Sequence, residues 1–265
     1  MSKRTKLLGA ACLAAAALAA GPASANSLMS MQGVLDTSFT RYMPKGGTDF
    51  NAWTLGGQVA GPLADIANMN FQAGASYAHE WATHSSTEDW NFNGDLFWAG
   101  SMSRFGIDLT YNTANTSGYA GGGGVFGEYY FGDITVAAKA GYISTGGQNQ
   151  GGDGNYFGLG AAFYPMPDLS ISGGWLWSGL NTGGSLCGGP TNCGVTGAHT
   201  NSWGAEAEFK LPADFLGGAP SIYGGLAYNQ FTGSFGPGPT PGKYDTHELV
   251  WRLGLRFYTG MGSLE

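Results

Sequence analysis

Apolar and polar residues alternate with period two along most of this 265-residue chain. The segment 248–258 shows the pattern best. Its odd-numbered residues are all Leu, Trp or Phe, whereas its even-numbered residues include Arg252 and Arg256. The segments 105–112 and 203–211 alternate in the same way. Because successive side chains of a strand point to opposite faces, this pattern predicts strands with one apolar and one polar face.

The same test predicts twelve strands, most of them 10–14 residues long. A typical globular strand has roughly five or six residues, whereas a tilted membrane-spanning strand needs about 9–11. The predicted lengths therefore favour strands that cross a membrane. They span 30–41, 51–61, 68–80, 89–99, 104–113, 119–131, 133–144, 155–164, 168–179, 201–211, 220–232 and 246–259.

The connections between these strands alternate between a short set and a mostly longer, polar and glycine-rich set. The short set is 62–67, 100–103, Gly132, 164–168 and 212–219, and the longer set is 42–50, 81–88, 114–118, 145–154, 180–200 and 233–245. Short periplasmic turns and longer external loops are typical of outer-membrane barrels. We therefore predict an all-β fold, a transmembrane antiparallel up-and-down β-barrel of about 12 strands.

The uncharged face of each strand is expected to meet lipid, because a charge exposed to hydrocarbon is costly. Aromatic residues of that face gather near both ends of the strands, as in the two aromatic belts of a membrane barrel. The expected belts are Trp53, Trp90, Trp177 and Trp203 near the longer connections, and Trp98, Phe105, Phe131, Phe163, Phe209 and Phe257 near the short ones.

The first 25 residues have the features of a secretory signal peptide. Lys3, Arg4 and Lys6 precede an apolar stretch over 7–20, and the small-residue triplet 23–25 follows. This order of a basic, an apolar and a small-residue segment is typical of cleaved signals. We expect cleavage after residue 25 and a single barrel domain over 26–265.

Loss of the signal would leave 8 Lys and Arg against 18 Asp and Glu, a net charge of −10. Nucleic acid is therefore not expected as a partner, because no basic stripe could neutralise phosphates. Two cysteines, Cys187 and Cys193, would remain in an oxidising compartment. We predict that they form a disulfide at the tip of the longest connection.

Together these features make the whole chain after the signal resemble the Gram-negative outer-membrane porin-like β-barrel superfamily. The last strand, 252–258, is similar to the C-terminal signal read by the barrel-assembly machinery, and it departs from it at Thr259, where a second aromatic residue is expected. The resemblance implies a location in the cell outer membrane among lipid and lipopolysaccharide. It implies no cofactor, no bound metal and no catalytic residue.

The polar face of the strands would then line the lumen. If the short connection 100–103 makes a hairpin in which Trp98 is opposite Phe105, then Asp95 is opposite Asp108. Two arrangements fit: walls of opposite charge that set a field across a pore, or salt bridges that merely fill the lumen. The predicted pore-lining residues are Asp36, Asp95, Asp108, Glu128, Lys139, Glu206, Glu208, Lys210, Arg252 and Arg256. We expect a passive channel for small hydrophilic solutes with a mild preference for cations, and the alternative is a structural barrel or surface antigen that conducts nothing.

Four histidines lie near predicted external strand ends, close to several acidic residues. They are His79, His84, His199 and His247, near Glu80, Glu88, Asp89, Asp245 and Glu248. Their spacing matches no metal site, and we interpret them as solvated loop residues.

The remaining alternative is a hydrolase that acts on membrane lipid. Barrel enzymes of this kind place a serine and a histidine on the lipid-facing surface near the external interface. Ser202 with His79 or His247 lies at a suitable height, although no family motif surrounds these residues.

Overall fold

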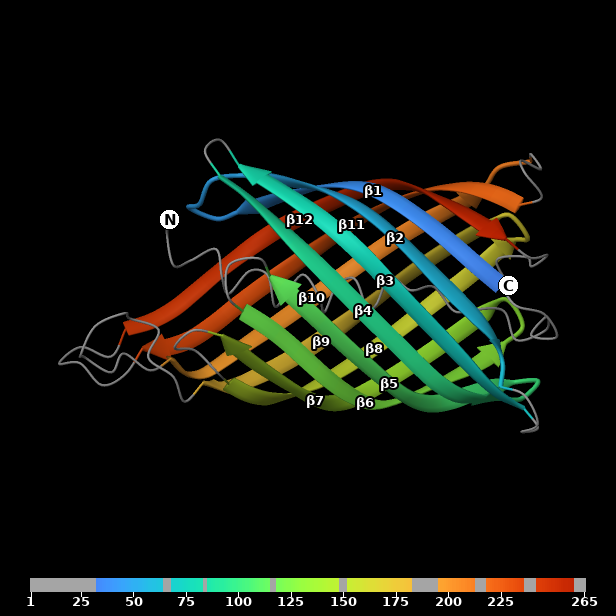
Figure 1. Cartoon of the computed structure of the whole chain (residues 1–265), viewed down its shortest axis with the longest axis horizontal. Helices are drawn as coiled ribbons and strands as arrows, with labels where there is room; N and C mark the ends of the chain where they lie inside the picture. The colour runs from blue at the N-terminus through green and yellow to red at the C-terminus, as the bar shows by residue number, and fades with distance from the viewer. Residues whose placement is uncertain are drawn as a thin grey trace.

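The computed structural model describes residues 32–63, 68–82, 85–114, 118–147, 152–182, 195–212, 218–235 and 242–259. These residues form a closed barrel of twelve antiparallel strands, in which each strand pairs with its neighbours in the chain (Figure 1). The strands are β1 (Gln32–Pro44), β2 (Phe50–Pro62), β3 (Met69–Ala82), β4 (Ser85–Ala99), β5 (Ser103–Ala114), β6 (Gly118–Phe131), β7 (Ile134–Gly147), β8 (Gly152–Met166), β9 (Leu169–Thr182), β10 (Val195–Lys210), β11 (Gly218–Phe235) and β12 (Gly242–Thr259). Within the described ranges, no helix is long and apolar enough to cross a membrane.

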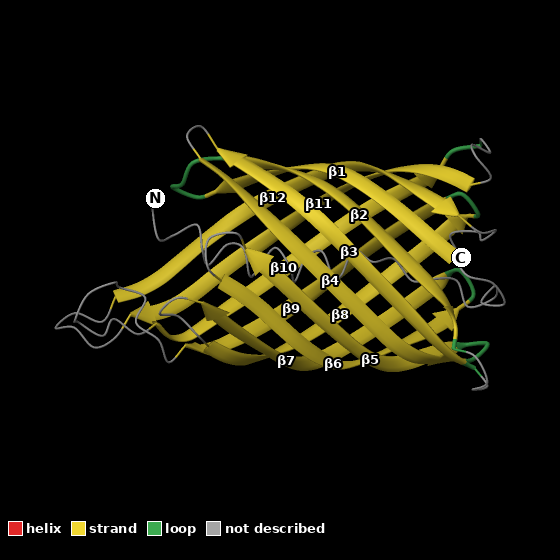
Figure 2. Ribbon diagram, in the orientation of Figure 1, coloured by secondary structure: helices red, strands yellow, loops and turns green. Residues whose placement is uncertain are grey.

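The barrel closes where β1 pairs with β12. Twelve residues of each strand are in register there, from Gly33 opposite Thr259 to Pro44 opposite Glu248. Closure pairs the backbone N–H and C=O groups of both strands, so that neither is an open edge. Figure 2 shows that almost all of the described chain belongs to this one sheet. The prediction of an antiparallel up-and-down barrel of about twelve strands is therefore confirmed.

We call the end of the barrel at which β1 joins β2 the loop end, and the end at which β2 joins β3 the turn end. The strands reach 12–18 residues and extend further toward the loop end than predicted. β4, for example, begins at Ser85 instead of 89, and only residues 83–84 separate it from β3. The backbones of polar residues pair as well as those of apolar residues do. A search for alternating apolar residues therefore misses the polar ends of strands.

The contrast between short and long connections is consequently smaller than the sequence predicts. Residues 83–84 are as short a connection as 132–133 at the turn end, which joins β6 to β7. At 132–133 the register pairs Phe131 with Ile134, and Gly132 has a φ of +58°. Glycine at the first position of a two-residue hairpin tolerates this backbone conformation, as a type II′ turn requires.

The outer surface of the barrel is apolar, as expected of a wall that meets lipid. Large apolar side chains at alternate positions are about half exposed, among them Leu35, Leu109, Leu226 and Leu253. Toward the loop end they include Trp53, Trp90 and Trp203, and toward the turn end Trp98, Phe105, Phe131, Phe163 and Phe209. Pairs of these rings stack across neighbouring strands, for example Trp98 with Phe105 at 5.7 Å between centroids.

Candidate functional site

The inner face of the barrel carries the charged residues. Arg252 and Arg256 flank the outward-facing Leu253 and Leu255 of β12, so both arginines project into the interior. The same phase places all ten residues that the sequence predicts for the lumen on the inner face. They are Asp36, Asp95, Asp108, Glu128, Lys139, Glu206, Glu208, Lys210, Arg252 and Arg256. Lys210 lies nearest the turn end, where it is opposite Ser221.

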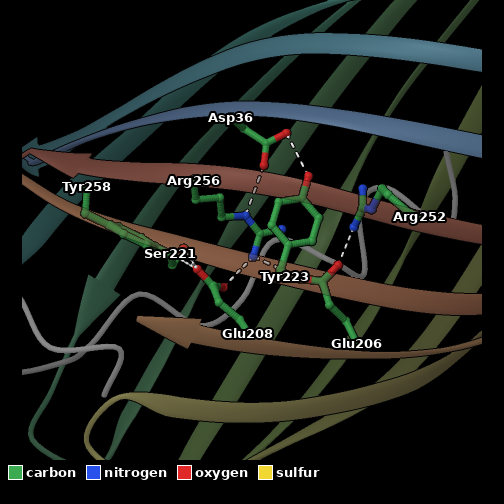
Figure 3. A network of polar contacts seen from close by, with 8 residues as sticks. All are labelled: Asp36, Glu206, Glu208, Ser221, Tyr223, Arg252, Arg256 and Tyr258. Atoms are coloured by element: carbon green, nitrogen blue, oxygen red, sulfur yellow. Dashed lines mark hydrogen bonds and ion pairs between the residues drawn. The ribbon is translucent and has the colours of Figure 1, made fainter. Parts of the chain in front are cut away.

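Arg256 is the centre of a network that joins four strands (Figure 3). Its guanidinium group forms ion pairs with Asp36 on β1 at 3.1 Å, and with Glu206 at 2.9 Å and Glu208 on β10. Arg252 pairs with Glu206 as well. We call this set, with Ser221, Tyr223 and Tyr258, the arginine cluster.

Tyr223 completes the arginine cluster from β11. The guanidinium carbon of Arg256 lies 4.0 Å from the centre of the Tyr223 ring, and that of Arg252 lies 5.1 Å from it. The Tyr223 hydroxyl donates to Asp36 at 3.0 Å, across the intervening strand β12. On β12 the residue opposite Tyr223 is Gly254, which leaves room for the ring.

A second set of charged residues covers β3 to β8, and we call it the carboxylate cluster. The register places Asp95 opposite Asp108, as hairpin arithmetic predicts from the sequence. Gln72 donates to Asp95 at 3.1 Å, and the Tyr156 hydroxyl donates to Asp108 at 2.8 Å. Tyr156 reaches Asp108 from three strands away because Gly124 and Gly141 have no side chains beneath it.

Arg104 is the cation of this cluster that the sequence analysis did not single out. It pairs with Glu128 at 2.8 Å, and its guanidinium carbon lies 4.9 Å and 5.3 Å from the ring centres of Phe97 and Phe126. Its position directly before the outward Phe105 already places it on the inner face. Lys139, which the sequence did predict, lies 5.8 Å from the ring centre of Tyr156.

These contacts match the second arrangement considered from the sequence, in which salt bridges fill the lumen. The carboxylates beside the basic strands neutralise both arginines, and the acidic wall of β4 to β6 contains its own cation in Arg104. The arginine cluster has three carboxylates and two arginines. The carboxylate cluster has Asp95, Asp108 and Glu128 against Arg104 and Lys139. Each cluster therefore has a formal net charge of −1, and with Lys210 the wall around the arginine cluster is neutral, so the two walls are not of opposite charge.

The loop-end half of the lumen contains a cavity of about 180 Å³. Its floor is formed by Glu206 and Arg252 of the arginine cluster. Above them the walls are mainly polar, with Thr40, Thr54, Asn91, Asn112, Ser202 and Asn229, and two carboxylates, Glu80 and Asp89. Acidic and uncharged polar groups therefore surround this space.

Solved structures of channels resemble this barrel in fold. An outer membrane channel from Pseudomonas putida F1 aligns over 88% of this chain and 98% of its own, with 9% identity and a TM-score of 0.57. The NanC porin aligns over 84% and 98%, with 10% identity and a TM-score of 0.54. The fold is that of the outer-membrane β-barrels. No protein-family model and no curated protein matches the sequence, and at such low identity the likeness shows the fold alone.

Three of the four histidines are not the solvated loop residues that the sequence suggests. His79, His199 and His247 lie within strands and contact aromatic rings of the outer face, as His199 does with Trp177 at 5.7 Å. His84 lies outside the described residues. Glu80 and Glu248, adjacent in sequence to two of these histidines, point to the inner face instead. Within the part of the chain that the structure describes, no group of acidic, histidine and cysteine residues is arranged to hold a metal ion.

The serine and histidines considered for a lipid hydrolase lie on opposite faces of the barrel wall. Ser202 is 1% exposed and lines the lumen cavity. His79 and His247 belong to the outer face, with His247 in contact with the ring of Tyr228. A base must reach the proton of its nucleophile, and these residues are separated by the sheet.

Cys187 and Cys193 lie outside the described residues. Their disulfide stays a prediction from the sequence. Titration of free thiols in the unfolded, unreduced protein tests it: we expect none, and two free thiols per chain would refute the disulfide.

Proposed function

We propose that this protein is a passive channel in the cell outer membrane for small hydrophilic solutes, with a mild preference for cations. The observation that carries the proposal is the separation of the two faces of the wall. The outer face is apolar, whereas the inner face is polar and charged and surrounds a cavity of about 180 Å³. A soluble barrel would place its large apolar side chains inside.

Export and insertion follow from the same proposal. Residues 1–25 would direct the chain across the inner membrane and be removed, which N-terminal sequencing of the mature protein tests. The barrel-assembly machinery would then insert the barrel among lipid and lipopolysaccharide. In β12, Phe257 lies on the outer face and Tyr258 on the inner face, where its hydroxyl donates to Glu208 at 2.7 Å.

The preference for cations is inferred from the balance of charge on the inner face. Among the described residues, nine inner-face carboxylates stand against five cations. The carboxylates are Asp36, Glu80, Asp89, Asp95, Asp108, Glu128, Glu206, Glu208 and Glu248, and the cations are Arg104, Lys139, Lys210, Arg252 and Arg256. A negative lumen raises the local concentration of cations. The Debye length is about 10 Å at 0.1 M salt, so the preference is expected to be mild.

Single-channel recording in planar bilayers tests the channel. Purified barrel should give discrete current steps in potassium chloride, and a salt gradient should give a reversal potential of the sign that indicates cation flow. Liposome swelling with uncharged sugars of increasing size should then give the size limit. If purified barrel gives no current steps and no swelling at any protein concentration, the channel proposal is wrong.

A second candidate is a barrel that conducts nothing and serves the surface structurally. The packing of the turn-end half favours it, since Phe97, Ser221 and Tyr223 are at most 1% exposed there. The same recordings distinguish the two, because only the structural barrel would be silent in a bilayer while folding normally.

A further inference from the structure

Three carboxylates converge on the loop-end half of the lumen, and no lysine or arginine of the described ranges forms an ion pair with them. They are Glu80 on β3, Asp89 on β4 and Glu248 on β12. Glu80 lies close enough to both of the others for like charges on them to repel. Deeper in the lumen, by contrast, four carboxylates pair with guanidinium groups: Asp36, Glu128, Glu206 and Glu208.

Several acceptor atoms around this space have no hydrogen-bond partner among the residues that the structure describes. Glu248 is fully buried, and its Oε2 accepts from the Asn229 side chain at 3.3 Å while its Oε1 accepts from nothing. Asn229 Oδ1, Ser202 Oγ and Asp89 Oδ1 are likewise buried without a partner. Burial of such groups without a hydrogen-bond partner is costly, most of all for charged groups. A partner that donates hydrogen bonds would offset that cost.

The unpartnered atoms of Ser202, Asn229 and Asp89 lie on two sides of one cavity, and Glu248 is buried directly beside it, where it accepts from Asn229. Ser202, Asn229 and Glu248 form a row across β10, β11 and β12, because the register places each opposite the next. Glu80 and Asp89 form the other side on β3 and β4, and Glu80 accepts from Thr87. Between them Tyr42 of β1 lines the cavity, with its ring stacked on that of Phe50 at 4.4 Å. We call these residues the loop-end acidic pocket.

The chemistry of the pocket selects the kind of ligand. Its free atoms are carboxylate, amide and hydroxyl oxygens, which accept hydrogen bonds from N–H groups, and Tyr42 adds an aromatic ring that a cation can approach. No group of described residues is arranged as a metal site, so the carboxylates do not form a compact cage for an inorganic ion. The cavity of about 180 Å³ has room for a small organic molecule, since one water occupies roughly 10–15 Å³ on the same measure.

We propose that the loop-end acidic pocket binds small organic cations with protonated primary amines, two-ended ones best. One ammonium group would bond to Asp89 and Glu80, and the other to Ser202 and Asn229, with the charge of Glu248 behind Asn229. The inference deepens the proposed function, because the bound amine would be a solute of the channel. Binding itself does not require conduction, so the two are tested separately.

Calorimetry with the purified barrel in detergent micelles tests the binding. The probe is 1,4-diaminobutane, and the matched neutral compound is 1,4-butanediol, which has the same chain length. We expect saturable binding of the diamine and none of the diol. The double variant Glu80→Gln with Asp89→Asn should bind the diamine at least about tenfold more weakly, since it removes both carboxylates that line the cavity and with them the charge-assisted hydrogen bonds to the ammonium group.

Glu88→Gln is the control, because Glu88 precedes Asp89 in β4 but is exposed on the outer face. It should bind the diamine as the unaltered protein does. Equal affinity in the double variant, equal binding of the diol, or displacement of the diamine by an equal concentration of magnesium would each overturn the proposal. Heat-dependent migration on gels verifies that the variants fold. If the diamine binds but the barrel gives no current in bilayers, the binding proposal is supported and the channel proposal is wrong. If currents are seen without binding, the reverse holds.

Discussion

Tyr223 lies over Gly254 of the neighbouring strand and donates its hydroxyl to Asp36, two strands away, at 3.0 Å. A Cβ atom at Gly254 would collide with the tyrosine ring. Tyr156 uses Gly141 and Gly124 in the same way to reach Asp108. In both halves of the barrel, glycines on the inner face thus allow a tyrosine to connect strands that are not neighbours.

Gly254→Ala should therefore destabilise the barrel by about 1–3 kcal/mol, the usual cost of overpacking. Gly224→Ala is the matched control, because a Cβ there would meet its nearest atoms at 3.7 and 3.8 Å, in ordinary contact. Urea unfolding in lipid vesicles, followed by tryptophan fluorescence, measures both. Equal stability of the two variants would contradict the close contact with Tyr223.

Arg256→Met should destabilise the barrel by about 3–5 kcal/mol, since it leaves the buried Glu208 and the partly buried Asp36 without their cation. Arg41→Met removes an ion pair with Asp49 whose side chains are 44% and 47% exposed, and should cost about 0–1 kcal/mol. The same unfolding measurement compares them. A loss for Arg256→Met no larger than that for Arg41→Met would show that the network does not stabilise the fold.

The orientation in the membrane can be read from cysteine labelling of intact cells. We expect the loop end to face outward, so a cysteine at the exposed Thr48 should react with an impermeant maleimide and one at the exposed Ser101 of the turn end should not. Both are introduced with Cys187 and Cys193 replaced by serine. Lysed cells should label at both positions, and the opposite pattern on intact cells would reverse the orientation.

Neutralising the acidic wall tests the origin of cation preference. Asp95→Asn with Asp108→Asn should shift the reversal potential in a salt gradient toward anions, because both carboxylates lie on the inner face, directly opposite each other. The shift should weaken as salt rises. Glu88→Gln, on the outer face, should leave the potential unchanged. An unaltered potential in the double variant would assign the preference to other carboxylates.

Period-two alternation was sufficient to predict the barrel and the face of each side chain. Along β12 every second residue from Leu249 to Phe257 is apolar, and the exposed outer surface of the structure follows that phase. The pairing of Asp95 with Asp108 was equally predictable, because a short connection fixes the register of the hairpin around it. Both features depend only on residues close together in the chain.

The meeting of lumen side chains was decided by tertiary structure alone. Arg256 reaches Asp36 only because β12 closes on β1, and the polar ends of strands such as β4 pair without any apolar signal. The loop-end acidic pocket likewise combines β3, β4 and β12, although the sequence associated its carboxylates with nearby histidines. Neighbouring residues of a strand point to opposite faces, so these carboxylates face the lumen while the histidines next to them in sequence face outward. The curvature of the closed sheet brings carboxylates of distant strands together.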